Sequence, residues 1–576
     1  MKRKLLMAAA AFLALLTANG QTTTRPSTPV RAVDALSGRS MLDQYCVGCH
    51  NDKARKANLS LEKLDLATVA DHPEFWEKVI RKLRAGVMPP PGMRRPALDE
   101  YEGLRDWLEA QIDRKAEEHP DPGSIVLHRL NRTEYANVIR DLLDLEIDPA
   151  TLLPSDDAAR GFDNVAGSLT ISPTLLEAYT TAATRIARMA VGYWKSPTIA
   201  NYVPPADSSQ NQHIEGLPLG TRGGILVTHN FPADGEYKFE IQNYGLGRYN
   251  PGEKIEFLVD GERIDLLDYV GVGLSVGMTA EDDGSILVTV PVKAGSHKVG
   301  VTFLATNYRP TLDLIKQYER KSLENNTIPQ LQYYPAIGLL RIQGPFGAAR
   351  PEDSASLRKI FVCRPARADQ ETPCAREIVA KLATRAYRRP LEAQDLETLM
   401  SFYAEGRKAG TFEDGIELAL RRMLTSPQFL ARVEREPANV APGKPYRISD
   451  LELASRLSFF LWSSIPDEIL IDLAAQNKLR DPAVLRRQVK RMLDDPRSSA
   501  LVTNFADQLF YLRNLPATSP DGVYYPNWDN ELRQGFKRET ELLFDSIIRE
   551  DRSLVDLLTA NYTFVNERLA RHYGIP

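Results

Sequence analysis

Cysteine is scarce in this chain, and several features that would point directly to a function are missing. Only 4 cysteines occur among 576 residues, and the formal net charge is -4, which gives no general attraction to nucleic acid. We find no tandem repeat and no low-complexity tract. The motifs of serine hydrolases, zinc proteases, nucleotide-binding loops and dinucleotide-binding folds are absent as well. These absences argue against nucleic-acid binding and the commonest enzyme classes, and they make the cysteines the most informative residues.

Long hydrophobic runs are also missing, with one exception at the N-terminus. A basic stretch at positions 2 to 4 precedes the apolar run Leu5 to Leu16, and small residues follow at Ala18 and Gly20. This pattern is typical of a signal peptide over residues 1–20, because the run is shorter than the roughly 20 apolar residues that span a bilayer. We therefore expect export to the periplasm or beyond, with no transmembrane segment in the mature chain; a retained N-terminal anchor is the alternative. Residues 21–37 are expected to form a linker.

Two of the cysteines stand in the sequence Cys46-Val47-Gly48-Cys49-His50. On a helix Cys46 and Cys49 lie one turn apart on one face, so each sulfur can bond a different vinyl group of a porphyrin. His50 then supplies the proximal nitrogen ligand to iron. A thioredoxin-like pair needs a strand-to-helix context, and a zinc site needs a second ligand pair nearby, which the chain lacks. The motif predicts one covalently attached haem c.

The sixth ligand of the haem iron is expected from the Pro-rich loop that follows. Met88, in Gly86-Val87-Met88-Pro89-Pro90-Pro91, is the best candidate, since a thioether raises the haem potential and the prolines hold its sulfur rigidly. Met93, His72 or an open site are the alternatives. The predicted metal ligands are therefore His50 and Met88.

A group of basic residues surrounds this loop, and no acidic residue lies between Lys78 and Leu98. Such a rim would steer an acidic redox partner to the haem edge. A solvated helix face with no partner explains the pattern equally well. The basic residues are Lys78, Arg81, Lys82, Arg84, Arg94 and Arg95.

The chain is too long for a single hydrophobic core, and its hydrophobic periodicity divides it into parts. Helical spacing around the Pro-rich loop predicts a small class I cytochrome c domain over residues 38–118. Residues 124–195, 350–440 and 443–576 also have helical periodicity. Alternating apolar residues with turn signals between them predict an antiparallel β-sandwich of jelly-roll type over residues 196–345. The expected fold is multidomain and mainly α, with the sandwich inserted.

Other candidate site residues lie outside the cytochrome domain. Cys363 and Cys374 lie in a Pro-containing loop, and in an oxidising compartment a disulfide is their simplest state. Two acidic pairs could bind calcium or serve a glycosidase, although such pairs are usually solvated turns; they are Asp156-Asp157 and Asp282-Asp283. Three tyrosines of the sandwich could be platforms for sugar rings, although strand-edge tyrosines more often serve packing; they are Tyr244, Tyr249 and Tyr308.

Several segments resemble a known family. The stretches Tyr45 to His50, Trp76 to Val79 and Leu83 to Pro90 resemble the planctomycete-type cytochrome c domain. Further stretches resemble helical modules of unknown function that accompany this domain in large secreted proteins; they are Arg129 to Tyr135, Gly161 to Asn164, Ala386 to Pro390 and Arg456 to Asp467. The resemblance implies haem ligation by Cys46, Cys49, His50 and Met88, and it carries no activity for the helical modules.

The same resemblance bears on the sandwich and on the C-terminus. The sandwich is similar to calcium-dependent carbohydrate-binding modules, which implies a Ca²⁺ ion, but their ligand residues cannot be matched one by one. Family members continue past a segment like Asn566 to Gly574, so an end at Pro576 suggests that further modules are missing.

Three functions are compatible with these observations. The first is an exported electron-transfer protein that serves a redox partner, and it has the strongest support. The second is a redox enzyme that acts on polysaccharide, with the sandwich holding the glycan. The third is an extracellular binding scaffold in which the haem is peripheral. An electron-transfer protein fits better than a defined enzyme because no catalytic residues beyond the haem ligands are evident.

Overall fold

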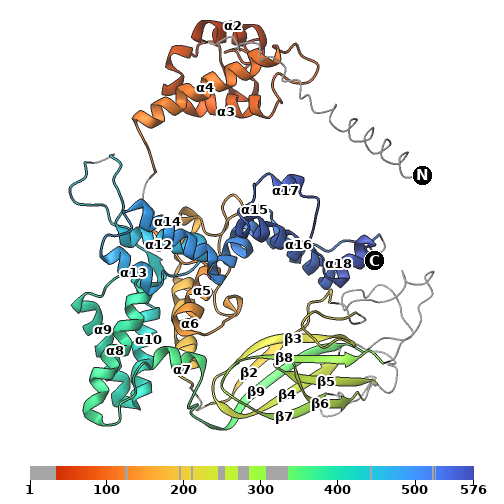
Figure 1. Ribbon diagram of the computed structural model, residues 1–576, viewed down its shortest axis with the longest axis vertical. Helices are drawn as coiled ribbons and strands as arrows, with labels where there is room; N and C mark the ends of the chain where they lie inside the picture. Colours follow the sequence, from red (N-terminus) through yellow and green to blue (C-terminus); the bar gives the residue numbers. More distant parts are fainter. Residues whose placement is uncertain are drawn as a thin grey trace, which may run out of the picture. The chain divides into compact units, whose positions relative to one another are not determined.

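The computed structural model describes residues 34–123, 127–193, 196–208, 210, 212–243, 253–269, 285–306, 335–441, 444–521, 524–525 and 527–576. The predicted signal peptide and most of the predicted linker lie outside these ranges. The chain divides into two compact units, which are described separately (Figure 1). Unit 1 runs to Ser124 and includes Val440–Tyr446, and unit 2 comprises Ile125–Asn439 and Arg447–Pro576. No helix within the described ranges is both long enough and apolar enough to cross a membrane.

Unit 1 is a small helical domain around one core. Helix α2 begins at Ala35 with a capping box between Asp34 and Ser37, and α3 begins at Pro73, whose ring suits the first turn of a helix. The buried residues of α3 are spaced by three and four and pack on α2 and α4; they are Trp76, Val79, Ile80 and Leu83. The elements are α2 (Ala35–Tyr45), η1 (Lys56–Asn58), η2 (Leu66–Asp71), α3 (Pro73–Arg84) and α4 (Leu98–Glu118).

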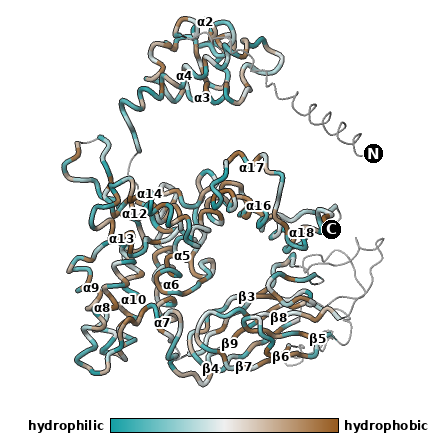
Figure 2. Tube along the Cα trace, in the orientation of Figure 1, coloured by the Kyte–Doolittle hydropathy of each residue, from teal (hydrophilic) through white to brown (hydrophobic). Residues whose placement is uncertain are grey.

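The helices on either side of the sandwich in unit 2 share one hydrophobic core, although the sandwich separates them in the sequence. Strand β1 (His128–Arg129) pairs antiparallel with β10 (Ala431–Arg432), which ties the two segments together. Apolar and polar positions are interleaved along these helices (Figure 2). The other elements are α5 (Arg132–Leu143), η3 (Pro149–Thr151), η4 (Ala166–Ser168), α6 (Pro173–Ala190), α7 (Ala355–Ile360), α8 (Ala368–Ala386), α9 (Ala393–Ala409), α10 (Phe412–Leu424) and α11 (Pro427–Leu430).

The inserted β region is a jelly roll, as predicted. Its described strands form two antiparallel sheets, in the orders β2-β9-β4-β7 and β3-β8-β5-β6, which is the strand order of this fold (Figure 1). Apolar residues of the alternating segments, such as Phe239, Phe257 and Phe303, are fully buried between the sheets. The strands are β2 (Thr198–Tyr202), β3 (Thr221–Phe231), β4 (Asp234–Asn243), β5 (Lys254–Val259), β6 (Glu262–Asp268), β7 (Ile286–Val292), β8 (Gly295–Leu304) and β9 (Ile337–Ala349).

The C-terminal part of unit 2 is helical and has its own small core around the buried side chain of Trp462. The indole Nε1 of Trp462 donates to the carbonyl of Met492 at 2.9 Å, and the Arg497 guanidinium lies 3.6 Å from the centre of its ring. The elements are α12 (Asp450–Trp462), α13 (Glu468–Ala475), α14 (Pro482–Asp494), η7 (Pro496–Ser498), the π-helix η8 (Leu501–Ala506), α15 (Asp507–Leu509), η9 (Leu512–Ala517), α16 (Asn530–Arg549), α17 (Asp556–Thr559) and α18 (Glu567–Tyr573).

Three of the sequence segments that resemble the helical modules are linked by buried and partly buried polar contacts, which run through Asn504 and Gln508. The Asn131 amide donates to the Asp163 carboxylate at 2.7 Å, and the Asp163 backbone N–H donates to the Gln508 side chain at 2.8 Å. The Asn504 amide in turn donates to the Ser463 hydroxyl at 2.9 Å. Because these residues come from distant parts of unit 2, the contacts join its helical segments.

Arg388 is a deeply buried cation of this region. It is 6% exposed, and its guanidinium donates to the carbonyls of Ala386, Gln428, Phe429 and Ala431 at 2.6 to 3.2 Å. The ring of Phe459 lies 6.0 Å from the guanidinium carbon. Burial lowers the pKa of Arg388 to about 9, so the side chain still carries its charge at neutral pH. Arg388 therefore joins the end of α8 to the chain that leaves α11.

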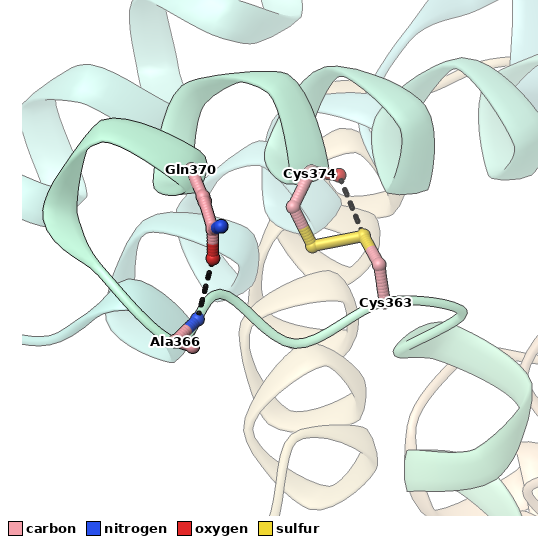
Figure 3. Close-up of a disulfide and its surroundings, with 4 residues drawn as sticks. All are labelled: Cys363, Ala366, Gln370 and Cys374. Carbon is pink, nitrogen blue, oxygen red and sulfur yellow. Dashed lines mark hydrogen bonds between the residues drawn. A yellow bond between two sulfur atoms is a disulfide. The ribbon is translucent and has the colours of Figure 1, made fainter.

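The predicted disulfide is present between Cys363 and Cys374 (Figure 3). Their Cα atoms are 5.9 Å apart, and the bond links the segment after α7 to the first half of α8. The Gln370 side chain accepts a hydrogen bond from the Ala366 backbone N–H at 3.0 Å, inside the same short loop. The disulfide and this bond hold the entry to α8.

Candidate haem site

The motif Cys46 to His50 forms a single turn at the end of α2. The Cys46 backbone N–H caps the helix by donating to the Leu42 carbonyl at 2.9 Å. The Cys46 carbonyl then accepts from the N–H groups of Cys49 and His50, at 3.1 and 2.9 Å. The Asn51 side chain donates to the Val47 carbonyl at 2.9 Å. These bonds fix the helical spacing that the motif requires.

The two thiols of the motif have different environments. Cys46 is half-buried and packs on the core of unit 1, and burial raises the pKa of its thiol to about 11. Cys49 is exposed, and a Cβ added at Gly48 would meet nothing within 4 Å. Both thiols are free, whereas Cys363 and Cys374 are bonded to each other. The motif therefore has one sulfur anchored in the core and an open side next to the other.

Two buried nitrogen atoms of unit 1 have no hydrogen-bond partner among the described residues. They are Nδ1 of His50 and Nε1 of Trp76, whose side chain is fully buried. A buried polar atom without a partner costs about 1–3 kcal/mol, so these two atoms leave room for a partner that the described protein atoms do not supply, such as water or a bound group. A haem would take the His50 imidazole as an iron ligand through one ring nitrogen, which leaves the other ring nitrogen as an N–H donor, and its carboxylates could accept from an indole N–H. The residues present therefore fit the group that the motif predicts.

The loop that carries Met88 starts from a tightly capped helix. At the end of α3 the Gly86 and Val87 N–H groups donate to the carbonyls of Leu83 and Lys82, at 2.9 and 3.2 Å. Gly86 has φ 64°, the left-handed conformation that this cap requires and that favours glycine. The side chain of Met88 is half-buried, and Pro89 after it is buried. The cap thus sets the position from which Met88 leaves the helix.

Side chains from outside the loop hold its backbone around Met88. The Tyr101 hydroxyl of α4 lies 2.7 Å from the Met88 carbonyl and 2.8 Å from that of Leu83. One Nη of Arg95 donates to the Gly86 carbonyl at 3.0 Å and also to the carbonyl of Pro89. The Tyr101 hydroxyl and this guanidinium, which we call the loop clamp, therefore contact the backbone before, at and after Met88.

The alternatives for the sixth ligand are more exposed. Met93 is 58% exposed, and His72 is an exposed residue at the start of α3 whose side chain makes no capping bond. The loop also reaches the start of the Cys46 to His50 turn, since the Arg94 guanidinium lies 5.6 Å from the ring centre of Tyr45, next to Cys46. These observations favour Met88 among the three.

The structure divides the predicted basic rim into two groups. Arg84 pairs with Glu109, and Arg94 and Arg95 make the contacts described above. Lys78, Arg81 and Lys82, all exposed on α3, form no ion pair with any described residue. These three exposed cations are available for a partner, although Lys78 also lies 5.7 Å from the ring centre of Phe75 and Arg81 donates to the Glu77 carbonyl at 3.4 Å.

Of the two acidic pairs, only Asp156-Asp157 lies in the described part of the chain, and it gains no support as a metal site. The Asp156 carboxylate, 5% exposed, binds the Arg129 guanidinium at 2.6 Å and accepts from the Arg132 N–H at 2.7 Å, which gives it a structural role. In the described part of the chain no group of three or more His, Cys, Asp or Glu side chains could hold a metal ion. Asp282, Asp283 and the three candidate sugar platforms, Tyr244, Tyr249 and Tyr308, lie outside the described residues.

Sequence reasoning did not identify the loop clamp. Tyr101 fits the apolar face of α4, and Arg95 fits a charged rim, so neither pattern reveals contacts with the carbonyls of residues 83 to 89. The only signal was the position of both residues close to a predicted ligand loop.

Family models match four parts of the chain. A model described as "Planctomycete cytochrome C" matches residues 46–92. Models described as "Protein of unknown function" match residues 128–192 (DUF1587), 374–434 (DUF1595) and 448–575 (DUF1592). No curated protein and no solved structure matches the chain. The chain therefore belongs to the planctomycete multidomain cytochrome c family, whose cytochrome domain implies covalently bound haem c.

Proposed function

We propose that this protein is an exported electron-transfer protein that carries a single haem c. Cys46 and Cys49 would form the two thioether bonds, His50 would be the proximal ligand and Met88 the sixth. The observation that carries the proposal is the Cys46 to His50 turn, with two free thiols and a buried imidazole nitrogen that lacks a partner. When bound, the haem iron supplies one-electron exchange, with a potential raised by a thioether ligand.

The protein's own residues suit this role. Cys46 would fix one edge of the cofactor to the core, because its side chain packs there. The exposed Cys49 and the open space at Gly48 leave the other side of the motif accessible to solvent. Access matters because electrons reach a partner through the edge of a cofactor that the partner can approach.

We infer that the partner is acidic where it docks. Lys78, Arg81 and Lys82 are exposed on α3 and free of ion pairs with described residues, and α3 leads directly into the Met88 loop. Exposed cations of this kind raise association rates with an anionic surface, and salt weakens the effect over a Debye length of about 8–10 Å.

Electron exchange measured against ionic strength tests this proposal. The reduced protein should react faster with an anionic acceptor protein than with a cationic one, and salt should slow the first reaction. Lys78→Glu with Lys82→Glu should lower that rate by at least about tenfold at low salt. Arg114→Glu, a charge reversal at an exposed position of α4, is the control. Equal rates for both acceptors at every salt concentration would refute the acidic partner.

A second function, binding of a neutral carbohydrate, has one observation in its favour. Unit 2 contains a groove of about 610 Å³ along β3 and β8. Thr228, Asn230 and Ser296 line it with Leu226 and Leu258, so hydroxyl and amide groups stand beside apolar ones, a combination that suits a sugar ring. Its lining also carries charge of both signs, from the acidic Asp144, Glu146 and Asp260 and the basic Lys298.

Retardation in gels that contain a neutral soluble polysaccharide tests this second function. Asn230→Ala should abolish the retardation, whereas Thr289→Ala, an exposed position on β7 of the other sheet, should not. Reduction of the haem by the same polysaccharide would make the protein a redox enzyme. No retardation by any neutral polysaccharide tried would remove the carbohydrate function.

A further inference from the structure

We propose that the loop clamp, formed by Tyr101 and Arg95, keeps Met88 on the haem iron, so that both are positioning residues for the sixth ligand. This inference rests on the proposed function, because it needs Met88 to be that ligand. Its support is the hydrogen bonding of the loop backbone. The clamp contacts the carbonyls of Gly86, Met88 and Pro89, which surround the ligand in the sequence.

Tyr101 has the more direct role. Its hydroxyl lies between the carbonyls of Leu83 and Met88, at 2.8 and 2.7 Å, so its single proton is shared between the last turn of α3 and the ligand residue itself. The Leu83 carbonyl has a second donor in the Gly86 N–H at 2.9 Å. Among the hydrogen bonds of the described residues, the Met88 carbonyl has Tyr101 alone. Loss of the hydroxyl therefore leaves Met88, rather than the helix end, without its bond.

Arg95 closes the loop from its other end. Its guanidinium donates to carbonyls on both sides of Met88, and the neighbouring Arg94 lies over the ring of Tyr45. Arg95 thus joins two parts of the loop to each other, and Arg94 joins the loop to the turn that carries Cys46. Methionine is a weak iron ligand on a flexible side chain, so a loosened backbone favours the dissociated state.

The expected effect is a shift between the Met-bound and Met-dissociated states of the iron. The clamp bonds exist with the loop in its present position and would be lost when the loop moves away. Removing a bond of ordinary strength should therefore increase the dissociated population about tenfold, which corresponds to about 1.4 kcal/mol. An exogenous ligand such as cyanide binds the dissociated form, so its apparent affinity should rise by the same factor.

The experiment uses the full haem-loaded chain and four variants, namely Tyr101→Phe, Arg95→Met, Met88→Ala and Thr68→Val. Thr68→Val is the control, because it also removes one hydroxyl bond from unit 1, that between Thr68 Oγ1 and the Asp65 carbonyl at 3.2 Å. The readouts are cyanide affinity of the oxidised protein, the weak red charge-transfer band of Met-ligated haem, and hydrogen exchange of the Val87 and Met93 amides. Exchange reports on the loop itself and does not depend on haem chemistry.

We expect Tyr101→Phe and Arg95→Met to bind cyanide about tenfold more tightly, to show a weaker band and to exchange Val87 and Met93 faster. Thr68→Val should match the wild type. If Met88→Ala removes the band but the two clamp variants bind cyanide within twofold of the control, the clamp is overturned and Met88 remains the ligand. If Met88→Ala leaves the band and the cyanide affinity unchanged, the ligand assignment fails and the clamp fails with it.

Discussion

Replacement of Arg388 by methionine should destabilise unit 2 more than any neighbouring surface change. Arg388 is buried, and its guanidinium donates to four backbone carbonyls at 2.6 to 3.2 Å. Methionine fills a similar volume but donates nothing, so these carbonyls lose a charged donor in a place that water does not reach. Each unsatisfied carbonyl costs about 1–3 kcal/mol, partly offset because the arginine charge no longer needs to be buried. We estimate a net loss of about 3–5 kcal/mol in the free energy of unfolding.

Urea unfolding followed by circular dichroism measures this loss for the transition of unit 2. Arg389→Met is the matched control, because the Arg389 side chain is 22% exposed and makes a close ion pair with Asp395 at 2.8 Å rather than hydrogen bonds to four buried carbonyls. Arg388→Lys keeps the charge but loses the planar guanidinium with its several N–H donors, so its free energy of unfolding should lie between those of the two methionine variants. If Arg388→Met and Arg389→Met unfold within about 1 kcal/mol of each other, the carbonyls do not depend on Arg388 and the reasoning is wrong.

Three further predictions concern the cysteines and pH. Cys363→Ser should destabilise the protein by roughly 3 kcal/mol, since the disulfide closes a loop with a sequence separation of 11. Neither Cys363 nor Cys374 should react with iodoacetamide before reduction, and ready labelling of both in the oxidised protein would contradict the disulfide. Burial and the nearby Arg432 lower the pKa of His128 to about 3. Between about pH 6.5 and 3 the unfolded chain is therefore protonated at His128 and the folded chain is not, so the free energy of unfolding should fall as the pH decreases through this range. An equally steep fall in His128→Asn would exclude this histidine as the cause. Mass spectrometry should find that Cys46→Ala retains haem through one thioether and that the double variant with Cys49→Ala has none; covalent haem on the double variant would disprove the assignment.

The jelly roll could be predicted because its signal is local. Alternation at Tyr237, Phe239 and Ile241 is read from the sequence without reference to distant residues, and all three are buried between the sheets. The haem motif is local in the same sense, since the turn from Cys46 to His50 needs only backbone bonds within a few residues.

The shared core of unit 2 could not be predicted in this way. Periodicity shows that α5 and α10 each have an apolar face, but it does not say that those faces meet across an inserted sandwich. The pairing of His128 with Arg432, more than 300 positions away, is decided by tertiary packing. The same limit applies to Arg388, because a charged residue in a helical segment is normally expected at the surface.

The loop clamp shows the same limit within the candidate site. Tyr101 follows Met88 by 13 positions, and its hydroxyl reaches the loop only because α3 and α4 pack side by side. A tyrosine on the apolar face of a helix is compatible with simple packing, so its hydrogen bond to Met88 depends on geometry that periodicity does not contain.

A pyridine haemochrome spectrum of the purified full chain, recorded before and after acid-acetone extraction, tests the central claim most directly. If Cys46 and Cys49 hold the cofactor, one haem per chain should stay with the protein after extraction, and its band should have the position of haem bound through two thioethers. The account would be contradicted if the haem passes into the solvent on extraction. It would also be contradicted if the protein carries no haem after expression in a host that attaches haem c.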